Sequence, residues 1–253
     1  MQHSKATSGT IIAAHRGGAG LWPENSLEAF RGAVGLGVEQ IETDLHLSRD
    51  LEPVIIHDPT LDRTTEGTGP VNEFDWSQLS TTQLSSASGA CIPHFDQLLD
   101  LMRDIDIGLR LELKVDATSA MYPEIETIVI SHLQRFGMQE RTIFTSFEWS
   151  YFKRLTHIEA DAPIIGLINA QRFQSLGGLA GAIEHAKFAG VEEISHPVDL
   201  LADDGVALAA KHGVRLGVYG AKSEPQIRRA LDCGVTAFTT DLPDLALKLQ
   251  RNA

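Results

Sequence analysis

The most constraining feature of this chain is a repeating alternation of short apolar runs with longer, helix-like segments. The alternation recurs roughly every 30 residues, which is the size of one strand followed by one helix. Parallel strands joined by helices cross over right-handedly, and eight such units can close into a barrel whose active face lies at the carboxyl ends of the strands. We therefore predict an α/β fold, a (β/α)8 barrel. The eight candidate strands are residues 10–15, 40–46, 108–114, 142–147, 163–168, 192–196, 214–219 and 237–240.

Several of the helix-like segments end at a glycine. Gly137, Gly213 and Gly234 each follow the last residue of such a segment, where a left-handed C-cap is needed. These helix ends place the start of the next strand just downstream. The clearest helical candidates are residues 26–34, 95–103, 122–136, 203–212 and 224–233.

One region interrupts the alternation. Residues 53–57 resemble a further short strand, and residues 58–93 are rich in Thr, Ser, Gly and Asp without sustained periodicity. An excursion of this length within a compact domain is usually functional. We predict a small insertion after the second barrel strand, roughly residues 58–93, with a short helix near residues 76–79, in a single domain that spans residues 1–253.

The charge of the chain excludes some classes of function. With 34 acidic and 21 basic residues the net charge is −13, which argues against a protein that binds nucleic acid or an anionic membrane surface. Any site for an anionic substrate must then be made locally positive by a metal ion and a few placed cations.

The cysteines and the N-terminal segment indicate an ordinary cytoplasmic protein. Cys91 and Cys233 show no metal-ligand spacing, and we interpret both as free thiols. The apolar run at residues 11–14 is too short for a signal-peptide core or a membrane span. We expect a cytoplasmic location, and the oligomeric state stays open.

Two of the candidate strands carry charged residues where apolar ones are expected. Side chains alternate along a strand, so residues two apart share a face. Leucines occupy the opposite face of the second of these strands, and the charged faces must therefore point into the barrel. The charged faces comprise Gln40, Glu42, Asp44 and His46 on one strand, and Arg110, Glu112 and Lys114 on the other.

Buried carboxylates require compensation, because an unpartnered buried charge is costly. Glu42, Asp44 and Glu112 form an all-oxygen set that suits one divalent cation, Mg²⁺ or Ca²⁺, better than Zn²⁺. The alternative is a structural salt-bridge network with Arg110 and Lys114.

Two histidines lie at strand ends near these carboxylates. His15 follows an apolar run and precedes Arg16, and His57 follows the run at residues 54–56. An imidazole titrates near neutral pH, so one histidine can accept a proton while the other donates one. We predict general acid–base catalysis of phosphodiester hydrolysis by His15 and His57, with Arg16 and Lys114 binding the phosphate. The sequence leaves open which histidine is the acid.

A partial dinucleotide-binding pattern and two further histidines are weaker evidence of function. The glycines from residue 35 onward lack the third glycine of a dinucleotide-binding fingerprint and precede a strand instead of following it. A supporting contact by His46 with the carboxylates, and a place for His196 in the pocket, are less favoured interpretations.

Taken together, the motifs resemble the glycerophosphodiester phosphodiesterase family along nearly the whole chain. Each tripeptide alone is weak evidence for the family, but the order and spacing of the motifs together are specific to it. The matching segments are His15-Arg16-Gly17, Pro23-Glu24-Asn25-Ser26, Glu42-Thr43-Asp44, His57-Asp58, Leu61-Asp62-Arg63-Thr64-Thr65, Glu112-Leu113-Lys114, Ser146-Phe147, Gly234-Val235 and Thr240-Asp241-Leu242-Pro243.

The resemblance implies a TIM barrel with an insertion after its second strand, and hydrolysis of glycerophosphodiesters to sn-glycerol 3-phosphate and an alcohol. It also implies that the glycerol 2-hydroxyl attacks first to give a cyclic phosphate. The implied roles are acid–base catalysis by His15 and His57, metal binding by Glu42, Asp44 and Glu112, and phosphate binding by Arg16 and Lys114.

This chain departs from the family pattern at two places, and other functions compete. Tyr219 stands where a tryptophan is expected, and residues 93–96 match loosely, so the preferred alcohol stays open. A glycoside hydrolase would also use paired carboxylates, but it leaves His15, His57 and Arg16 without a role. Hydrolysis of another phosphodiester and a non-catalytic glycerophosphodiester-binding barrel are the remaining alternatives.

Overall fold

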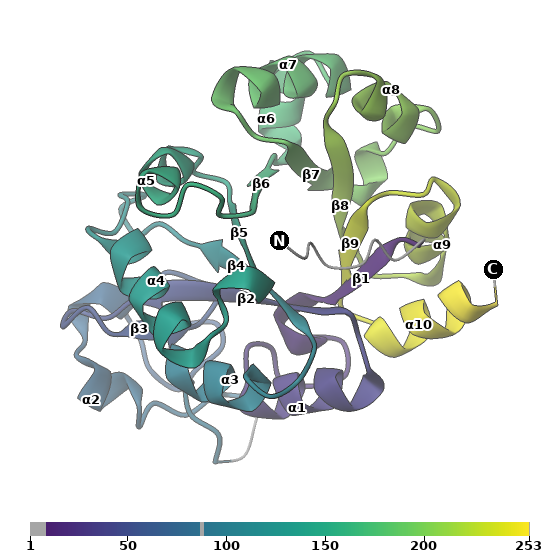
Figure 1. Ribbon diagram of the computed structural model, residues 1–253. Coiled ribbons are helices and arrows are strands. Elements are labelled where there is room, and N and C mark those ends of the chain that lie inside the picture. The colour runs from purple at the N-terminus through teal and green to yellow at the C-terminus, as the bar shows by residue number, and fades with distance from the viewer. Residues whose placement is uncertain (1–8, 87–88, 253) are drawn as a thin grey trace.

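The computed structural model describes residues 9–86 and 89–252, and in these residues nine strands form one sheet that closes into a barrel (Figure 1). β1 pairs in parallel with both β2 and β9, which closes the ring. β3 runs antiparallel to β2, and the other eight strands are parallel, so the predicted (β/α)8 barrel is confirmed. The strands are β1 (Ile11–Ala14), β2 (Gln40–Leu47), β3 (Pro53–Ile55), β4 (Gly108–Leu113), β5 (Thr142–Ser146), β6 (Ile164–Leu167), β7 (Glu193–Pro197), β8 (Arg215–Ala221) and β9 (Ala237–Thr240).

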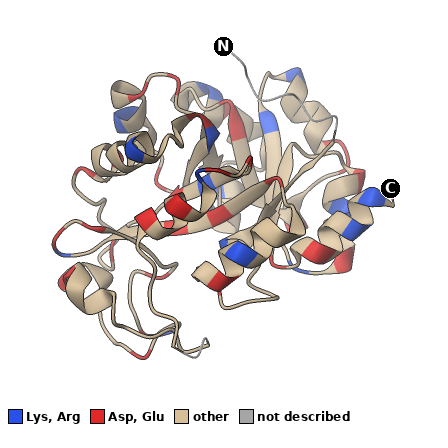
Figure 2. Cartoon of the chain, turned by 60° about the horizontal axis from the view of Figure 1, so that its bottom comes forward, with Lys and Arg blue, Asp and Glu red and all other residues tan. Residues whose placement is uncertain are grey.

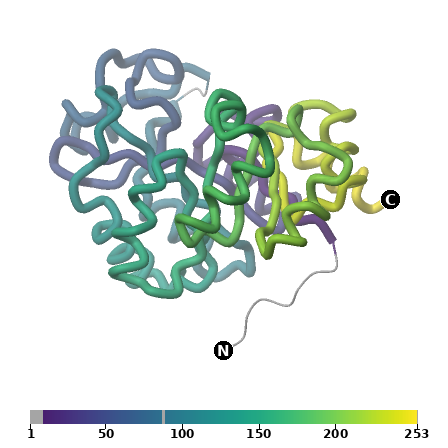
Figure 3. Tube along the Cα trace, turned by 90° about the horizontal axis from the view of Figure 1, so that it is seen from above, coloured from purple at the N-terminus to yellow at the C-terminus, as the bar shows by residue number. Residues whose placement is uncertain are grey.

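Helices surround the strands, and the chain runs once around the ring. Figure 3 shows the purple N-terminal strand beside the yellow C-terminal elements. The helices are α1 (Leu27–Leu36), α2 (Trp76–Leu79), α3 (Phe95–Met102), α4 (Ile125–Phe136), α5 (Ser150–Ile158), α6 (Ala170–Ser175), α7 (Leu179–Ala189), α8 (Gly205–Lys211), α9 (Glu224–Asp232) and α10 (Pro243–Arg251). Short 3-10 turns are η1 (His15–Gly17), η2 (Val71–Glu73), η3 (Gln139–Arg141) and η4 (Val198–Leu200). Within the described residues, no helix is both long and apolar enough to cross a bilayer.

Some predicted boundaries were wrong for local reasons. β1 ends at Ala14, one residue before His15, which opens η1. α4 begins at Ile125 and not at Tyr122, because Pro123 disfavours helical geometry in the residue before it. β8 continues to Ala221, and β3 ends two residues before His57. The glycine stop predicted at Gly137 is a left-handed C-cap with φ of 67°.

The core lies between the barrel and its helices. Leu109, Leu111 and Leu113 of β4 are buried in the same apolar cluster as Leu98 and Leu99 of α3. The leucine face of this strand therefore packs on helices, as the alternation predicted, and the charged face of β4 points into the barrel. Fully burying a leucine contributes about 1.5–3 kcal/mol, so this layer fixes which way the charged residues face.

The insertion forms a small unit beside the carboxyl end of β2. β3 pairs there through Ile55 with Leu45 and through Pro53 with Leu47. A separate apolar cluster supports the insertion, and α2 lies at the predicted place. The buried members of this cluster are Val54, Ile56, Leu61, Val71, Leu79, Leu84 and Ile92. The insertion thus holds the segment that contains His57 against the edge of the barrel mouth.

Candidate active site

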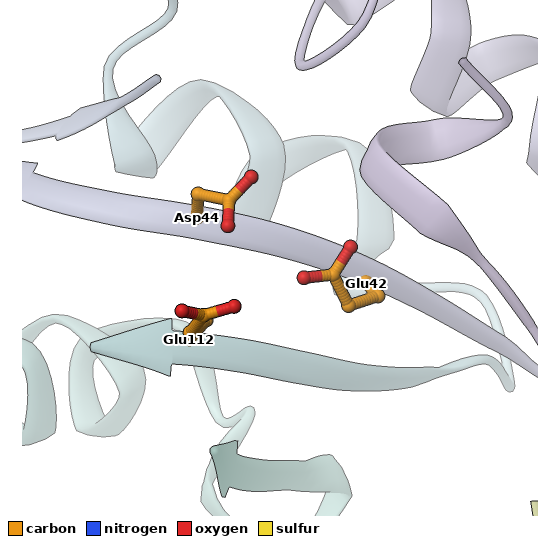
Figure 4. Close-up of side chains that lie close together, drawn as sticks. All are labelled: Glu42, Asp44 and Glu112. Carbon is orange, nitrogen blue, oxygen red and sulfur yellow. The ribbon is translucent and has the colours of Figure 1, made fainter. Parts of the chain in front are cut away.

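Three buried carboxylates face one another inside the barrel (Figure 4). Glu42 and Asp44 extend from β2, and Glu112 extends from β4 opposite Asp44 in the strand register. Each offers an oxygen within 4.8 Å of the other two, and their exposed fractions are 4%, 1% and 7%. Figure 2 likewise shows acidic residues within the barrel strands as well as on the outside of the molecule. This cluster can hold a metal ion.

The cations around these carboxylates compensate them only in part. Burial, with Asp44 as a repelling neighbour, raises the pKa of Glu42 to about 7. Burial also raises the pKa of Glu112, although Lys114 opposes this. Asp44 differs, because Lys114, His57 and Arg16 together outweigh its burial and lower its pKa. Two of the three carboxylates are therefore left with unfavourable charge that a bound cation would relieve.

Lys114 lies among the carboxylates. Its Nζ is 2.8 Å from an oxygen of Asp44 and 2.5 Å from an oxygen of Glu112. These two neighbours outweigh burial and raise the pKa of Lys114. Both salt bridges belong to the network that the alternative interpretation proposed.

Arg16 is held in a backbone conformation that few non-glycine residues adopt. Its φ of 52° lies in the left-handed region, and its backbone N–H donates to Glu42 at 2.9 Å. The guanidinium donates to Glu24 at 2.7 Å and lies 3.5 Å from Asp44. The turn η1 thereby brings the N–H and the guanidinium of one residue to the carboxylate cluster.

Each predicted catalytic histidine is held by a carboxylate. His15 Nδ1 lies 2.5 Å from Asp241, and His57 Nδ1 lies 2.5 Å from Asp58. Because Nδ1 of each ring is engaged, Nε2 is the nitrogen that remains for proton exchange. Burial lowers the pKa of His57, whereas for His15 the charges of Glu42 and Asp241 outweigh burial and raise it.

Replacing Asp241 by Asn should lower the pKa of His15. A neighbouring carboxylate stabilises the imidazolium, so its removal favours the neutral ring and the titration moves to lower pH. NMR titration of the His15 ring in metal-free protein measures this shift. His57 is held by a different carboxylate, Asp58, and serves as the internal control. An unchanged His15 titration would show that Asp241 does not stabilise its charged form.

Sequence reasoning assigned no role to several residues that support the site. Asn25 donates to Asp44 at 2.8 Å, and Arg63 joins Asp58 to Glu24. All of these residues, and Asp241, stood within quoted motifs, but the motif alone does not say which partner each contacts. Several of these partners lie far apart in the chain, such as Arg63 and Glu24 or His15 and Asp241, so local periodicity carried no signal for those contacts.

His46 and His196, the two histidines given less favoured roles, have different surroundings in the structure. His46 contacts the backbone oxygen of His57 at 3.1 Å and Tyr122 at 2.9 Å. It therefore supports the main chain of a predicted catalytic residue, and its hydrogen bonds do not go to the carboxylates. Burial lowers the pKa of His46 to about 4, so it is neutral. His196 packs against Phe173.

A cavity of about 220 Å³ at the carboxyl ends of the strands is lined by most of the predicted site residues, but Asp44 and Lys114 are not part of its lining. Phe147, Leu167 and Tyr219 contribute apolar surface to this lining. Lys222 stands at the rim, where its Nζ is 3.3 Å from Asp241. The cavity lining also includes His15, Arg16, Glu42, His57, Arg110, Glu112, Thr145, Ser195, Gly220 and Thr239.

A closed ring of eight parallel strands, with a cavity at their carboxyl ends that charged side chains line in part, defines a TIM-barrel protein of the kind that carries enzyme active sites. The model of the glycerophosphoryl diester phosphodiesterase family matches residues 15–245. The chain belongs to this family of phosphodiesterases, as the sequence motifs predicted.

Three relatives match this chain over nearly their full lengths. A glycerophosphodiester phosphodiesterase from Caldanaerobacter subterraneus subsp. tengcongensis is 30% identical over 96% of this chain and 98% of the relative. The crystal structure of a protein from Agrobacterium tumefaciens, described as a putative glycerophosphoryl diester phosphodiesterase, has a TM-score of 0.93 against this chain. The two sequences are 31% identical, and the match covers 97% of this chain and 98% of that one. A phosphodiesterase from Oleispira antarctica, solved with its product sn-glycerol-3-phosphate, has a TM-score of 0.80 at 21% identity, over 97% and 98% of the two chains.

Proposed function

We propose that this protein hydrolyses glycerophosphodiesters to sn-glycerol 3-phosphate and an alcohol, using His15 and His57 as its acid–base pair and a divalent cation held by Glu42, Asp44 and Glu112. One observation carries the proposal. Two carboxylate-held histidines line the same cavity as two of the three clustered carboxylates. The product found in the Oleispira antarctica relative supports the choice of glycerol 3-phosphate.

The two imidazoles supply the proton transfers. In the first step one imidazole accepts the proton of the attacking glycerol 2-hydroxyl through Nε2, the other gives a proton to the oxygen of the leaving alcohol, and a cyclic phosphate forms. In the second step a water molecule attacks the phosphorus and gives its proton to the second imidazole, while the first returns its proton to the glycerol oxygen as the ring opens. Asp241 and Asp58 fix the ring orientations and favour the imidazolium form that arises during transfer. The Arg16 guanidinium lies at the cavity and binds the phosphate oxygens, where its planar fork suits two of them at once.

The carboxylate cluster fits a hard divalent cation. Its ligands are oxygens, they converge, and the raised pKa values of Glu42 and Glu112 reflect negative charge that is not fully compensated. When bound, Mg²⁺ or Ca²⁺ would supply Lewis-acid stabilisation of negative charge on the phosphate. Lys114, which contacts two of the carboxylates, is proposed to assist in phosphate binding.

The direct test is release of glycerol 3-phosphate from glycerophosphocholine and glycerophosphoethanolamine, with Mg²⁺, Ca²⁺ and Mn²⁺ supplied separately. Release with at least one ion is expected. Absence of release with every ion and both substrates would contradict the proposal and leave the binding-protein alternative.

Metal affinity should weaken as the pH falls below neutral. The pKa of Glu42 is about 7 in the metal-free protein, so below that pH the residue is increasingly protonated and must lose its proton to bind. The affinity should fall by about tenfold per pH unit well below pH 7, and binding near pH 7 should release protons. Isothermal titration calorimetry in buffers of different ionisation enthalpy measures both effects. Equal affinity at pH 6 and pH 8 would contradict the assignment of Glu42 as a ligand.

A further inference from the structure

A buried chain of hydrogen bonds joins the main chain at His57 to the main chain at Lys114. His46, near the end of β2, contacts the Tyr122 hydroxyl through Nδ1 at 2.9 Å and the main-chain oxygen of His57 through Nε2 at 3.1 Å. The hydroxyl of Tyr151 on α5 accepts from the N–H of Tyr122 at 3.0 Å and donates to the main-chain oxygen of Lys114 at 2.9 Å. His46, Tyr122 and Tyr151 are 0%, 4% and 0% exposed, so water does not compete for these bonds.

The direction of each bond at His46 follows from the groups that take part. A main-chain oxygen can only accept, so Nε2 of the ring carries the proton that it donates to His57. In the neutral ring Nδ1 then has no proton, and it accepts from the hydroxyl of Tyr122. Both ring nitrogens are thus engaged. His46 therefore has no nitrogen left for a substrate or a metal ion, and it can act on the reaction only through the residues that it holds.

His57 lies beyond the strand pairing of its own segment. The N–H of Ile56 donates to the main-chain oxygen of Asp44 at 3.2 Å. Asp58 fixes the imidazole of His57, but it is the next residue and belongs to the same segment. Arg63, which holds Asp58, is 46% exposed, and exposed ion pairs contribute little. The two tyrosines belong to the apolar core between the barrel and its helices, so the buried hydrogen-bond chain anchors this segment to the core.

We propose that His46 and Tyr122 are positioning residues that act on the reaction through His57. The inference rests on the proposed function. The two side chains hold the main chain of His57 so that Nε2 of its ring meets the oxygen that gains or loses a proton. Misplacing such a group by about 1 Å can lower a rate about 100-fold. Among the described residues no hydrogen bond joins either side chain to a proposed metal or phosphate ligand, so loss of the chain should lower kcat and leave KM and the metal requirement nearly unchanged.

Kinetics of variants at His46 and Tyr122 on glycerophosphocholine test the proposal. His46→Leu makes no hydrogen bond, and it should lower kcat about 10–100-fold while KM changes less than about threefold. His46→Gln should restore kcat to within about threefold of the wild type, because its amide nitrogen can donate to His57 and its amide oxygen can accept from Tyr122. Tyr122→Phe removes only the hydroxyl. It should lower kcat in the same way, and it serves if His46→Leu fails to fold.

A double-mutant cycle separates positioning of His57 from general loosening of the fold. In a His57→Ala background there is no imidazole to position, so adding His46→Leu should not lower the residual kcat further. His94→Leu is the matched control, because His94 is also a buried histidine whose two ring nitrogens are hydrogen-bonded, to Glu52 and to the main chain of Asp96. This control should keep the wild-type kcat even where it lowers the thermal stability.

Full kcat in both His46→Leu and Tyr122→Phe would overturn the positioning role. An equal loss of kcat in His94→Leu, or a further loss when His46→Leu is added to His57→Ala, would also overturn it and assign the chain to stability alone. Inactivity of the wild type on glycerophosphocholine would instead overturn the proposed function itself.

Discussion

His15→Ala and His57→Ala should each reduce kcat on glycerophosphocholine by about 10²–10⁴-fold, the usual contribution of a positioned acid or base. Each substitution removes an imidazole that lines the cavity and is fixed by a carboxylate. Steady-state kinetics at saturating metal measures the loss. Thermal unfolding of the same samples shows whether the fold persists.

His157→Ala is the matched control for this pair. His157 is an exposed histidine on α5, so its loss should leave kcat unchanged. Near-normal turnover in His15→Ala or in His57→Ala would exclude that residue as a proton carrier. Full substrate affinity with no turnover in the wild type would instead favour the binding barrel.

Chelation should abolish hydrolysis, and one added divalent cation should restore it. The expected cause is the carboxylate cluster, because its three buried residues offer converging oxygens. Glu112→Gln keeps the size of the side chain and removes its charge, so it should raise the metal concentration needed for half-maximal activity by at least about tenfold. Metal titrations of activity after treatment with EDTA measure both effects.

Glu126→Gln provides the corresponding control. Glu126 is also a buried glutamate, but it lies on α4 near Arg154, outside the barrel interior. Its metal requirement should match that of the wild type. Activity that survives exhaustive chelation would favour a salt-bridge role for the cluster, and an unchanged requirement in Glu112→Gln would remove Glu112 from the ligand set.

The sequence by itself predicted the architecture and the grouping of the acidic residues. Alternation along a strand is a local property, so Glu42 and Asp44 had to share one face, and the leucines opposite Glu112 had to pack outward. Burial of those leucines then forced the charges inward. The alternation of strand and helix segments likewise predicted eight parallel strands, because two neighbouring parallel strands must be joined by a crossover helix.

Only the tertiary structure decided which residues support the site and how deep it extends. Asp241 holds His15 across a separation of 226 residues, and this contact exists because β9 closes the ring against β1. The same closure brings Arg110 toward Glu193 and places Thr239 in the lining of the cavity. A sequence pattern records which face a side chain takes along its own strand. Contacts across a barrel depend on its closure and on the register between strands, and no local periodicity encodes these.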